Sequence, residues 1–336
     1  MNHGFVSCGC SCIPIRVADC HYNAEQIVKA VQRAAEQGVE VLCLPELCLT
    51  GYTCEDLFFQ PALLRGVLDA LEVILKKTAD LSVLFAVGAP LLYEGKLYNC
   101  AVVAQSGKIL GVVPKTHLPN YNEFYEQRHF CAAPKDTGVI ELLGQGVPFG
   151  TKLLFACLEH PCLKIAVEIC EDLWAPVSPG VSHALAGATI LLNLSASDEL
   201  IGKASYRKDL VSGQSARLLC GYLYADAGEG ESTTDLVFAG HHLIAENGTM
   251  LAQSKPFANE DIAVEIDVER LAWERSKNTS FPANDSGEYT VIPFHTKDTS
   301  APLRRTISPA PFVPQNESER FERCEAILEM QAQGLK

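Results

Sequence analysis

The chain has 336 residues, of which 48% are hydrophobic and 20% are charged, as in an ordinary soluble globular protein. Its formal net charge of -14 argues against a nucleic-acid partner and against an anionic membrane surface, because both require clustered lysine and arginine. The sequence contains no apolar run of about 18 residues and no secretory signal pattern, so we expect a cytoplasmic protein that does not bind membranes.

Strands alternate with helices along most of the chain, and hairpins are interspersed among them. This mixture predicts an α/β protein with mixed sheets. Apolar runs bounded by turn residues predict strands at 5–12, 39–44, 83–88, 96–105, 109–114, 153–158, 163–169, 189–194, 222–225, 236–245 and 261–266. Apolar residues at helical spacing predict helices at 22–37, 63–79, 182–186 and 203–219.

The sequence changes character after residue 298. Prolines recur between 299 and 315 and predict an extended segment. The residues from Asn316 to Glu319 resemble a helix start, and a weakly amphipathic run follows. We therefore predict one domain at 1–298 and, at 299–336, a connector with a C-terminal helix. That helix could pack on its own domain or lead into a further segment.

The cysteines and histidines indicate no metal site. Most of the fourteen cysteines lie inside apolar runs, where a free thiol behaves as a small hydrophobic group, and this usage suits a reducing compartment. Cys8, Cys10 and Cys12 alternate along one predicted strand and would share one of its faces. His241 and His242 have no further ligand at helical spacing. We therefore predict neither a metal nor a cofactor.

Three segments place a reactive side chain at the end of an apolar strand. Glu46 follows strand 39–44, Lys115 follows strand 109–114, and Cys170 follows strand 163–169. Each residue alone has an ordinary explanation, as a solvated glutamate, a surface lysine or a structural cysteine. Glu46 lies at the carboxyl end of its strand, where α/β sheets bind ligands. The order and spacing of the three residues are a stronger signal than any one of them.

The order of these residues and their flanking motifs resemble the Glu-Lys-Cys triad of the carbon–nitrogen hydrolase (nitrilase) superfamily. The motifs are Pro45-Glu46, Pro114-Lys115 and Cys170-Glu171-Asp172-Leu173-Trp174. The resemblance implies a four-layer α-β-β-α sandwich with amidase activity. It also implies that Cys170 is the nucleophile, Glu46 the general base and Lys115 the third catalytic group.

Further segments resemble the glutaminase domain of NAD synthetases within this superfamily. They lie at 118–128, 170–176, 193–203 and 228–235. This resemblance implies L-glutamine as the substrate and a homo-oligomeric assembly. It also implies that Tyr121, Ser197 and Lys203 hold the α-amino and α-carboxylate ends of glutamine. Glu126 would be a supporting carboxylate near Lys115.

The same resemblance implies a partner, namely a NAD synthetase domain or subunit. Residues 323–335 are similar to the connector that leads into the synthetase domain in that family. ATP, Mg and deamido-NAD would bind to this partner, because the present sequence contains no Gly-rich phosphate-binding loop.

Alternatives remain open at two levels. Among the residues, Glu126 could pair with Arg128 on the surface, Tyr121 could be a simple loop aromatic, Ser197 could cap a helix and Lys203 could be solvated. For the protein, one alternative is a free-standing nitrilase-family amidase that acts on another small amide. The other is a non-catalytic assembly module, against which the intact triad argues.

Overall fold

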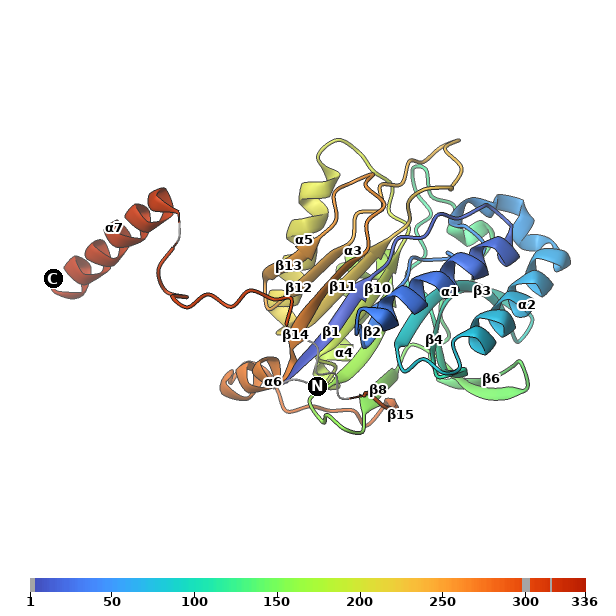
Figure 1. The fold of residues 1–336 in the computed structure, drawn as a ribbon, viewed down its shortest axis with the longest axis horizontal. Helices are drawn as coiled ribbons and strands as arrows, with labels where there is room; N and C mark the ends of the chain where they lie inside the picture. Colours follow the sequence, from blue (N-terminus) through green and yellow to red (C-terminus); the bar gives the residue numbers. More distant parts are fainter. Residues whose placement is uncertain (1–3, 298–302, 315) are drawn as a thin grey trace. The chain divides into compact units, whose positions relative to one another are not determined.

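Two β-sheets pack face to face, and helices cover the outer face of each (Figure 1). The computed structural model describes residues 4–297, 303–314 and 316–336. One buried cluster joins the helices α1 and α2 to the first sheet, and a second lies between the two sheets. A third joins the second sheet to the helices α4 and α5. The fold is therefore the expected four-layer α-β-β-α sandwich.

The strands form two mixed sheets. The first sheet has the order β14 (Ile262–Asp267), β1 (Phe5–Cys10), β2 (Val41–Cys43), β3 (Leu84–Tyr93), β4 (Lys96–Gln105), β5 (Lys108–Pro114), β7 (Gln145–Phe149) and β6 (Gly138–Leu142). The second has the order β13 (Thr249–Gln253), β12 (Leu243–Glu246), β11 (Gly221–Asp226), β10 (Ile190–Ser195), β9 (Lys164–Ile169), β8 (Leu153–Cys157) and β15 (Thr290–Phe294). The neighbours β1, β2 and β3 of the first sheet are parallel, as are β9, β10 and β11 of the second, so within each set the carboxyl ends lie at one edge.

Capping hydrogen bonds and glycine conformation help to set the ends of the helices, as α1 shows. The α-helices are α1 (Cys20–Glu36), α2 (Pro61–Lys77), α3 (Glu171–Trp174), α4 (Pro179–Leu185), α5 (Lys203–Leu218), α6 (Val268–Lys277) and α7 (Glu317–Gly334), and the 3-10 helices are η1 (Tyr52–Phe59) and η2 (Glu126–Arg128). At the start of α1, the side chain of Asp19 accepts a hydrogen bond from the backbone N–H of Tyr22. Beyond its end, Gly38 adopts a positive φ of 71°, which glycine accommodates without a Cβ clash.

The predicted strand 236–245 is wrong over most of its length. Only Leu243–Glu246 forms a strand, and the residues before it contribute an isolated bridge between Phe238 and Asp198. The apolar pattern at Leu236 and Phe238 reflects their burial in a small cluster with Ala196 and Ala227 and not pairing in a sheet. The backbone of Gly240, at φ 60°, also departs from strand geometry.

Four strands and the α-helices α3 and α6 were not predicted. The strands are β6, β7, β13 and β15. β6 and β15 are edge strands with exposed residues, so their apolar patterns are weak. β15 also contains Pro293, and proline is tolerated in a sheet mainly at an edge, where its missing N–H breaks no ladder.

The expected cysteine face is correct for two of three residues. Cys8 and Cys10 both face the core between the sheets. Cys12 lies beyond the end of β1, and its thiol donates a hydrogen bond to Asn259 Oδ1 at 3.4 Å. The cause is that β1 stops at Cys10, so the alternation of the strand does not extend to Cys12.

The chain divides into two compact units, Met1–Pro302 and Leu303–Lys336. The predicted domain boundary at residues 298 and 299 lies outside the described residues. In the second unit, the side chain of Asn316 caps α7 by accepting a hydrogen bond from the N–H of Ser318, and no residue of α7 is buried. None of the described helices combines the length and apolar character needed to cross a membrane.

At Gly88 the backbone of β3 passes close to the segment that carries Glu46. Gly88 lies in β3, directly behind that segment, and its carbonyl accepts a hydrogen bond from the N–H of Leu49 at 3.1 Å. A Cβ added at Gly88 would lie 2.1 Å from the nitrogen of Leu47 and 2.6 Å from the oxygen of Pro45. The close approach of these two backbones therefore requires glycine.

We expect Gly88→Ala to lower the free energy of unfolding by about 3 kcal/mol and to displace Glu46, because the neighbouring backbone cannot move away cheaply. Gly213→Ala is the matched control. Gly213 lies in α5, where an added Cβ meets no atom within 4 Å, so this change should stabilise the helix by about 0.5 kcal/mol or more. Urea unfolding measures both. Equal stabilities for the two variants would contradict the close approach.

Candidate active site

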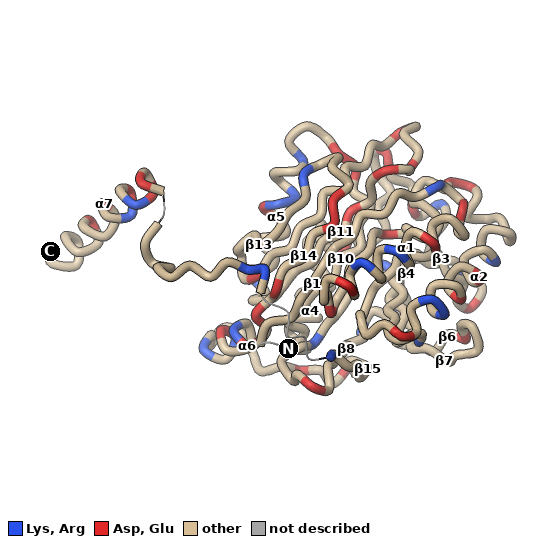
Figure 2. The backbone as a smooth tube through the Cα atoms, in the orientation of Figure 1, with Lys and Arg blue, Asp and Glu red and all other residues tan. Residues whose placement is uncertain are grey.

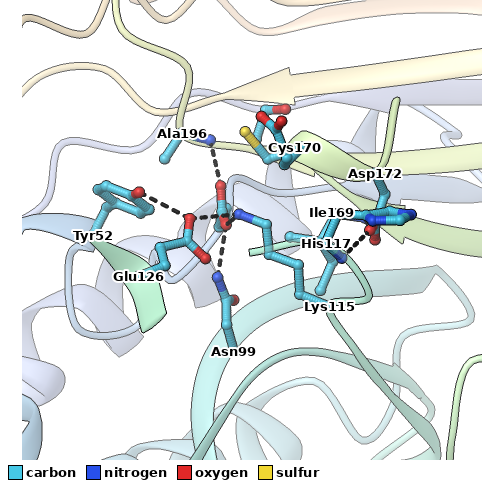
Figure 3. Close-up of polar contacts among 12 residues, drawn as sticks. Tyr52, Asn99, Lys115, His117, Glu126, Ile169, Cys170, Asp172 and Ala196 are labelled. Carbon is cyan, nitrogen blue, oxygen red and sulfur yellow. Dashed lines mark hydrogen bonds and ion pairs between the residues drawn. The ribbon is translucent and has the colours of Figure 1, made fainter. Parts of the chain in front are cut away.

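Lys115 and Cys170 of the predicted triad lie near each other where the two sheets meet (Figure 3), and Glu46 forms an ion pair with Lys115. Glu46 follows β2 and Lys115 follows β5 in the first sheet, whereas Cys170 follows β9 in the second. The exposed fraction of Glu46 and of Lys115 is 0%, and that of Cys170 is 6%. Residues far apart in the sequence thus form one buried site, which only the stacking of the two sheets creates.

Lys115 lies between two carboxylates. Its Nζ is 2.6 Å from Glu46 Oε1 and 2.6 Å from Glu126 Oε1. Asn99 Nδ2 donates to Glu46 Oε1 at 2.7 Å, and the hydroxyl of Tyr52 donates to Glu126 Oε1 at 2.9 Å. This arrangement fixes both carboxylates around one ammonium group, and it excludes the surface pair between Glu126 and Arg128.

The buried cluster changes the proton affinities of its members. Burial by itself would lower the pKa of Lys115, but Glu126 and Glu46 raise it well above its usual value, so the side chain is an ammonium. Burial raises the pKa of Glu126 to about 7, against the opposing effect of Lys115. The site therefore holds a fixed positive charge beside a carboxyl group that titrates near neutral pH.

Cys170 is a thiol in the resting site. Burial raises the pKa of Cys170 well above its usual value, and the charge of Glu46 raises it further, while Lys115 lowers it. A thiol in this condition is unreactive until a base removes its proton. The role of Glu46 as that base stays a prediction. Glu46 Oε1 faces Lys115, and Glu46 Oε2 accepts a hydrogen bond from the N–H of Ala196 at 2.8 Å.

Asp172 connects the turn of Cys170 with the loop that follows Lys115. Its carboxylate accepts hydrogen bonds from the N–H of Ile169 at 3.0 Å and from the N–H of His117 at 2.7 Å (Figure 3). Burial raises the pKa of Asp172 to about 8, against these two hydrogen bonds, which lower it. The segments of two of the three triad residues are therefore joined by one buried side chain.

Two of the predicted substrate-binding residues lie close to α3, one near each end. The hydroxyl of Tyr121 donates to Glu171 Oε1 at 2.9 Å, although the residue is 51% exposed. Lys203 pairs with Asp198, and its Nζ lies 5.4 Å from the ring centroid of Trp174. Lys203 is thus not a freely solvated lysine, and Tyr121 is fixed by its hydroxyl.

Ser197 lies deeper. Its N–H donates to Asp226 Oδ1 at 2.9 Å, and its hydroxyl accepts from Arg207 Nη2 at 3.4 Å. The residue before α5 is Gly202, so Ser197 does not cap that helix. Arg207 is fully buried and also pairs with Glu199 at 2.9 Å. The structure brings Ser197 and Lys203 to the same edge of the second sheet, and their roles toward a substrate stay predictions.

Several residues of the site were not predicted from the sequence. Tyr52, Asn99 and the N–H of Ala196 all contact the carboxylates around Lys115. An asparagine inside a strand and a tyrosine at the start of a 3-10 helix carry no local signal of such a role. Asp172 could have been found, because it lies two positions after Cys170 in a motif that resembles other members of the superfamily. Within the described part of the chain, no group of three or more His, Cys, Asp or Glu side chains could hold a metal ion.

Comparison with known families decides the class of this site. The carbon-nitrogen hydrolase family model matches residues 7–273, which is most of the chain. The chain belongs to the carbon–nitrogen hydrolase family. It is therefore an amidohydrolase-type enzyme, and the fold and the buried Glu-Lys-Cys cluster agree with that membership.

Curated relatives narrow the comparison within this family. The glutamine-dependent NAD(+) synthetase of Mycobacterium tuberculosis is 38% identical over 345 aligned positions, which cover 100% of this chain and 51% of that protein. The glutamine-dependent NAD(+) synthetase of Aquifex aeolicus is 31% identical and is matched over 75% of this chain and 41% of its own length. The chain thus spans about half the length of the curated relatives it matches.

Solved structures give the same result. A glutamine-dependent NAD(+) synthetase from Cytophaga hutchinsonii superposes with a TM-score of 0.69 at 32% identity, covering 80% of this chain and 45% of that one. An amidase of the nitrilase superfamily from Nesterenkonia, at 20% identity, superposes with a TM-score of 0.63 over 82% of this chain and 97% of its own. The second comparison shows the carbon–nitrogen hydrolase fold alone.

The buried carboxyl groups predict a pH dependence of stability. Burial raises the pKa of Glu126 to about 7 and that of Asp172 to about 8, so the folded chain binds these protons more tightly than the unfolded chain. Their contribution to stability is complete below the ordinary carboxyl pKa and is lost as pH rises through the folded values. Burial lowers the pKa of His183 and of His242 to about 4, so these two histidines add stability as pH rises. Their contribution is complete above the ordinary histidine pKa.

We therefore expect the free energy of unfolding to fall from about pH 6.5, where the histidine effect is complete, to about pH 8. Glu126→Gln, which cannot titrate, should reduce the slope in the part of this range below about pH 7, and Glu141→Gln on the exposed edge strand β6 should not. Urea unfolding at several pH values measures the slopes. A slope that is unchanged in Glu126→Gln would show that Glu126 does not titrate in this range.

Proposed function

We propose that the chain hydrolyses the side-chain amide of L-glutamine through a thioester at Cys170. The ammonia would serve the ATP-dependent amidation of deamido-NAD to NAD by a synthetase domain or subunit. One observation carries the catalytic part, namely the buried Lys115 that two carboxylates hold beside a buried cysteine. The curated relatives and the Cytophaga structure, whose names specify glutamine and NAD, support the choice of substrate and partner.

The first half of the reaction forms the thioester. Glu46 takes the proton of the Cys170 thiol, and the thiolate attacks the amide carbon of glutamine. The Lys115 ammonium stabilises the oxyanion that develops, together with the backbone N–H that follows Cys170. Glu46 then gives its proton to the leaving nitrogen, the C–N bond breaks, and ammonia departs.

The second half releases glutamate. Glu46, again a carboxylate, removes a proton from water, and the hydroxide adds to the thioester carbon. Collapse of this intermediate breaks the C–S bond, and the proton on Glu46 returns to the sulfur. Glu126 holds Lys115 in place through both halves, since its Oε1 lies 2.6 Å from the ammonium. The amidase reaction needs no cofactor in this scheme.

The remaining parts of the proposal concern the surroundings of the enzyme. Tyr121, Ser197 and Lys203 would bind the α-amino and α-carboxylate groups of glutamine. ATP, Mg and deamido-NAD would bind to the synthetase partner.

A homo-oligomer in the cytoplasm completes the proposal, and the fourteen free cysteines suit a reducing compartment. Lysine and arginine are scattered among acidic residues in the view of Figure 2, so no basic face is visible there.

A free-standing amidase for another small amide is the second candidate. The likeness in fold to the Nesterenkonia amidase, which is matched over 97% of its length, favours it. The two candidates share the same triad and differ only in what the pocket accepts. A screen of small amides beside glutamine separates them.

Cys170→Ala should abolish ammonia release from L-glutamine, because the thiolate is the attacking group. Cys162→Ala, in the partly buried loop before β9, should keep the parent rate. Glu46→Gln should lower the rate by a factor of about 100 or more, because general-base catalysis is lost. An enzyme-linked ammonia assay measures all three. Full activity in Cys170→Ala would rule out the proposed nucleophile.

Lys203→Ala should raise the KM for glutamine about tenfold or more and change kcat less, because the lost charge contacts the substrate and not the reacting bond. Lys208→Ala is the matched control, since Lys208 is exposed on the same helix. Steady-state kinetics with both variants test the assignment. Equal KM values for Lys203→Ala and the parent chain would remove Lys203 from the binding site.

A further inference from the structure

A second buried polar network lies behind Cys170, on the face of the second sheet that the helices cover. It contains Asn193 of β10, Tyr222 of β11 and Glu168 of β9, whose exposed fractions are 0%, 0% and 1%. Asn193 and Glu168 are direct neighbours in the parallel pairing of β10 with β9. None of the three residues belongs to the triad or to the predicted substrate contacts.

The three side chains form one chain of hydrogen bonds that ends at the nucleophile. The hydroxyl of Tyr222 donates to Glu168 Oε1, and Asn193 Nδ2 donates to the oxygen of Tyr222 at 3.0 Å. Asn193 Oδ1 then accepts from the backbone N–H of Cys170 at 3.1 Å. That N–H is shared with the carbonyl of Leu194 at 2.9 Å.

The carboxylate determines the direction of the bonds from Tyr222 and from Asn193 Nδ2, and the hydroxyl of Ser195 also donates to Asn193 Oδ1 at 2.8 Å. Glu168 Oε2 accepts from the hydroxyl of Ser178 at 2.7 Å and from the N–H of Gly180 at 2.7 Å, so Glu168 acts only as an acceptor. Tyr222 has a single proton and must donate it to Glu168. Its oxygen can then only accept from Asn193, which turns the amide so that Oδ1 faces Cys170.

Cys170 needs such support because its backbone is strained. Its φ is 43° and its ψ is −99°, a conformation that side chains other than glycine rarely adopt. Strain of this kind persists only when surrounding contacts hold it. Asp172 ties the turn to the loop after Lys115, and the network described above holds the N–H of Cys170 from the opposite side of the strand.

We propose that Glu168, Tyr222 and Asn193 are positioning residues that hold the Cys170 turn in its reactive conformation. They act by fixing the orientation of the Asn193 amide. The proposal rests on the proposed function in one respect only, the role of Cys170 as nucleophile. The network touches no substrate, so its loss changes the reactivity of the thiol and leaves substrate binding unchanged.

The test compares Tyr222→Phe with Tyr289→Phe. Both changes remove one hydroxyl from a tyrosine at the helix-covered face of the second sheet, and the hydroxyl of Tyr289 pairs with His183, which is not joined to Asn193. Iodoacetamide labelling of Cys170, followed by peptide mass spectrometry and carried out below the unfolding temperature of each variant, measures thiol reactivity without glutamine. Ammonia release gives kcat and KM in parallel.

We expect Tyr222→Phe to slow Cys170 labelling about tenfold and to lower kcat with KM unchanged, while Tyr289→Phe labels at the parent rate. Glu168→Gln leaves the direction of donation undetermined, because an amide both donates and accepts, and should slow labelling about threefold. Labelling of Glu168→Gln is the deciding test if Tyr222→Phe does not fold. Parent labelling rates in folded Tyr222→Phe or in Glu168→Gln would overturn the proposal. If the parent chain releases no ammonia from glutamine, the substrate assignment falls, and the labelling comparison still tests the network.

Discussion

The site depends on one interaction, the burial of the Lys115 ammonium between Glu46 and Glu126. A buried ion pair gains little over apolar packing, whereas a buried charge that has lost its partner is strongly destabilising. Each member of this cluster therefore requires the others. The hydrogen bonds from Asn99 and Tyr52 then give the two carboxylate oxygens that face the ammonium a second donor each.

The two sheets supply the members of this cluster from different strands. The carboxyl ends of β2 and β5 bring Glu46 and Lys115 to the edge of the first sheet, and β9 brings Cys170 to the edge of the second. The apolar core between the sheets excludes water from the cluster. In such surroundings fixed charges act more strongly than in water, which suits the stabilisation of an oxyanion.

The turn at Cys170 is held by polar side chains on both sides. Asp172 links it to the Lys115 loop, and Asn193 links it to Tyr222 and Glu168 on the outer face of the second sheet. Burial raises the pKa of both carboxyl groups, Asp172 and Glu168, so the fixed geometry lowers the stability of the fold at higher pH. This cost is typical of functional sites.

The sequence by itself determined the α/β class and most central strands, because these depend on apolar periodicity. Motifs at strand ends that resemble the carbon–nitrogen hydrolase family also predicted a site with Glu46, Lys115 and Cys170. It failed at the edge strands β6 and β15 and at 236–242, where burial in a loop produced a strand-like pattern. Only the tertiary structure decided that Glu126 pairs with Lys115 and not with Arg128, and that Asn193 reaches Cys170. The physical reason is that these contacts join distant strands, whose relative positions are set by how two sheets stack and not by any local pattern.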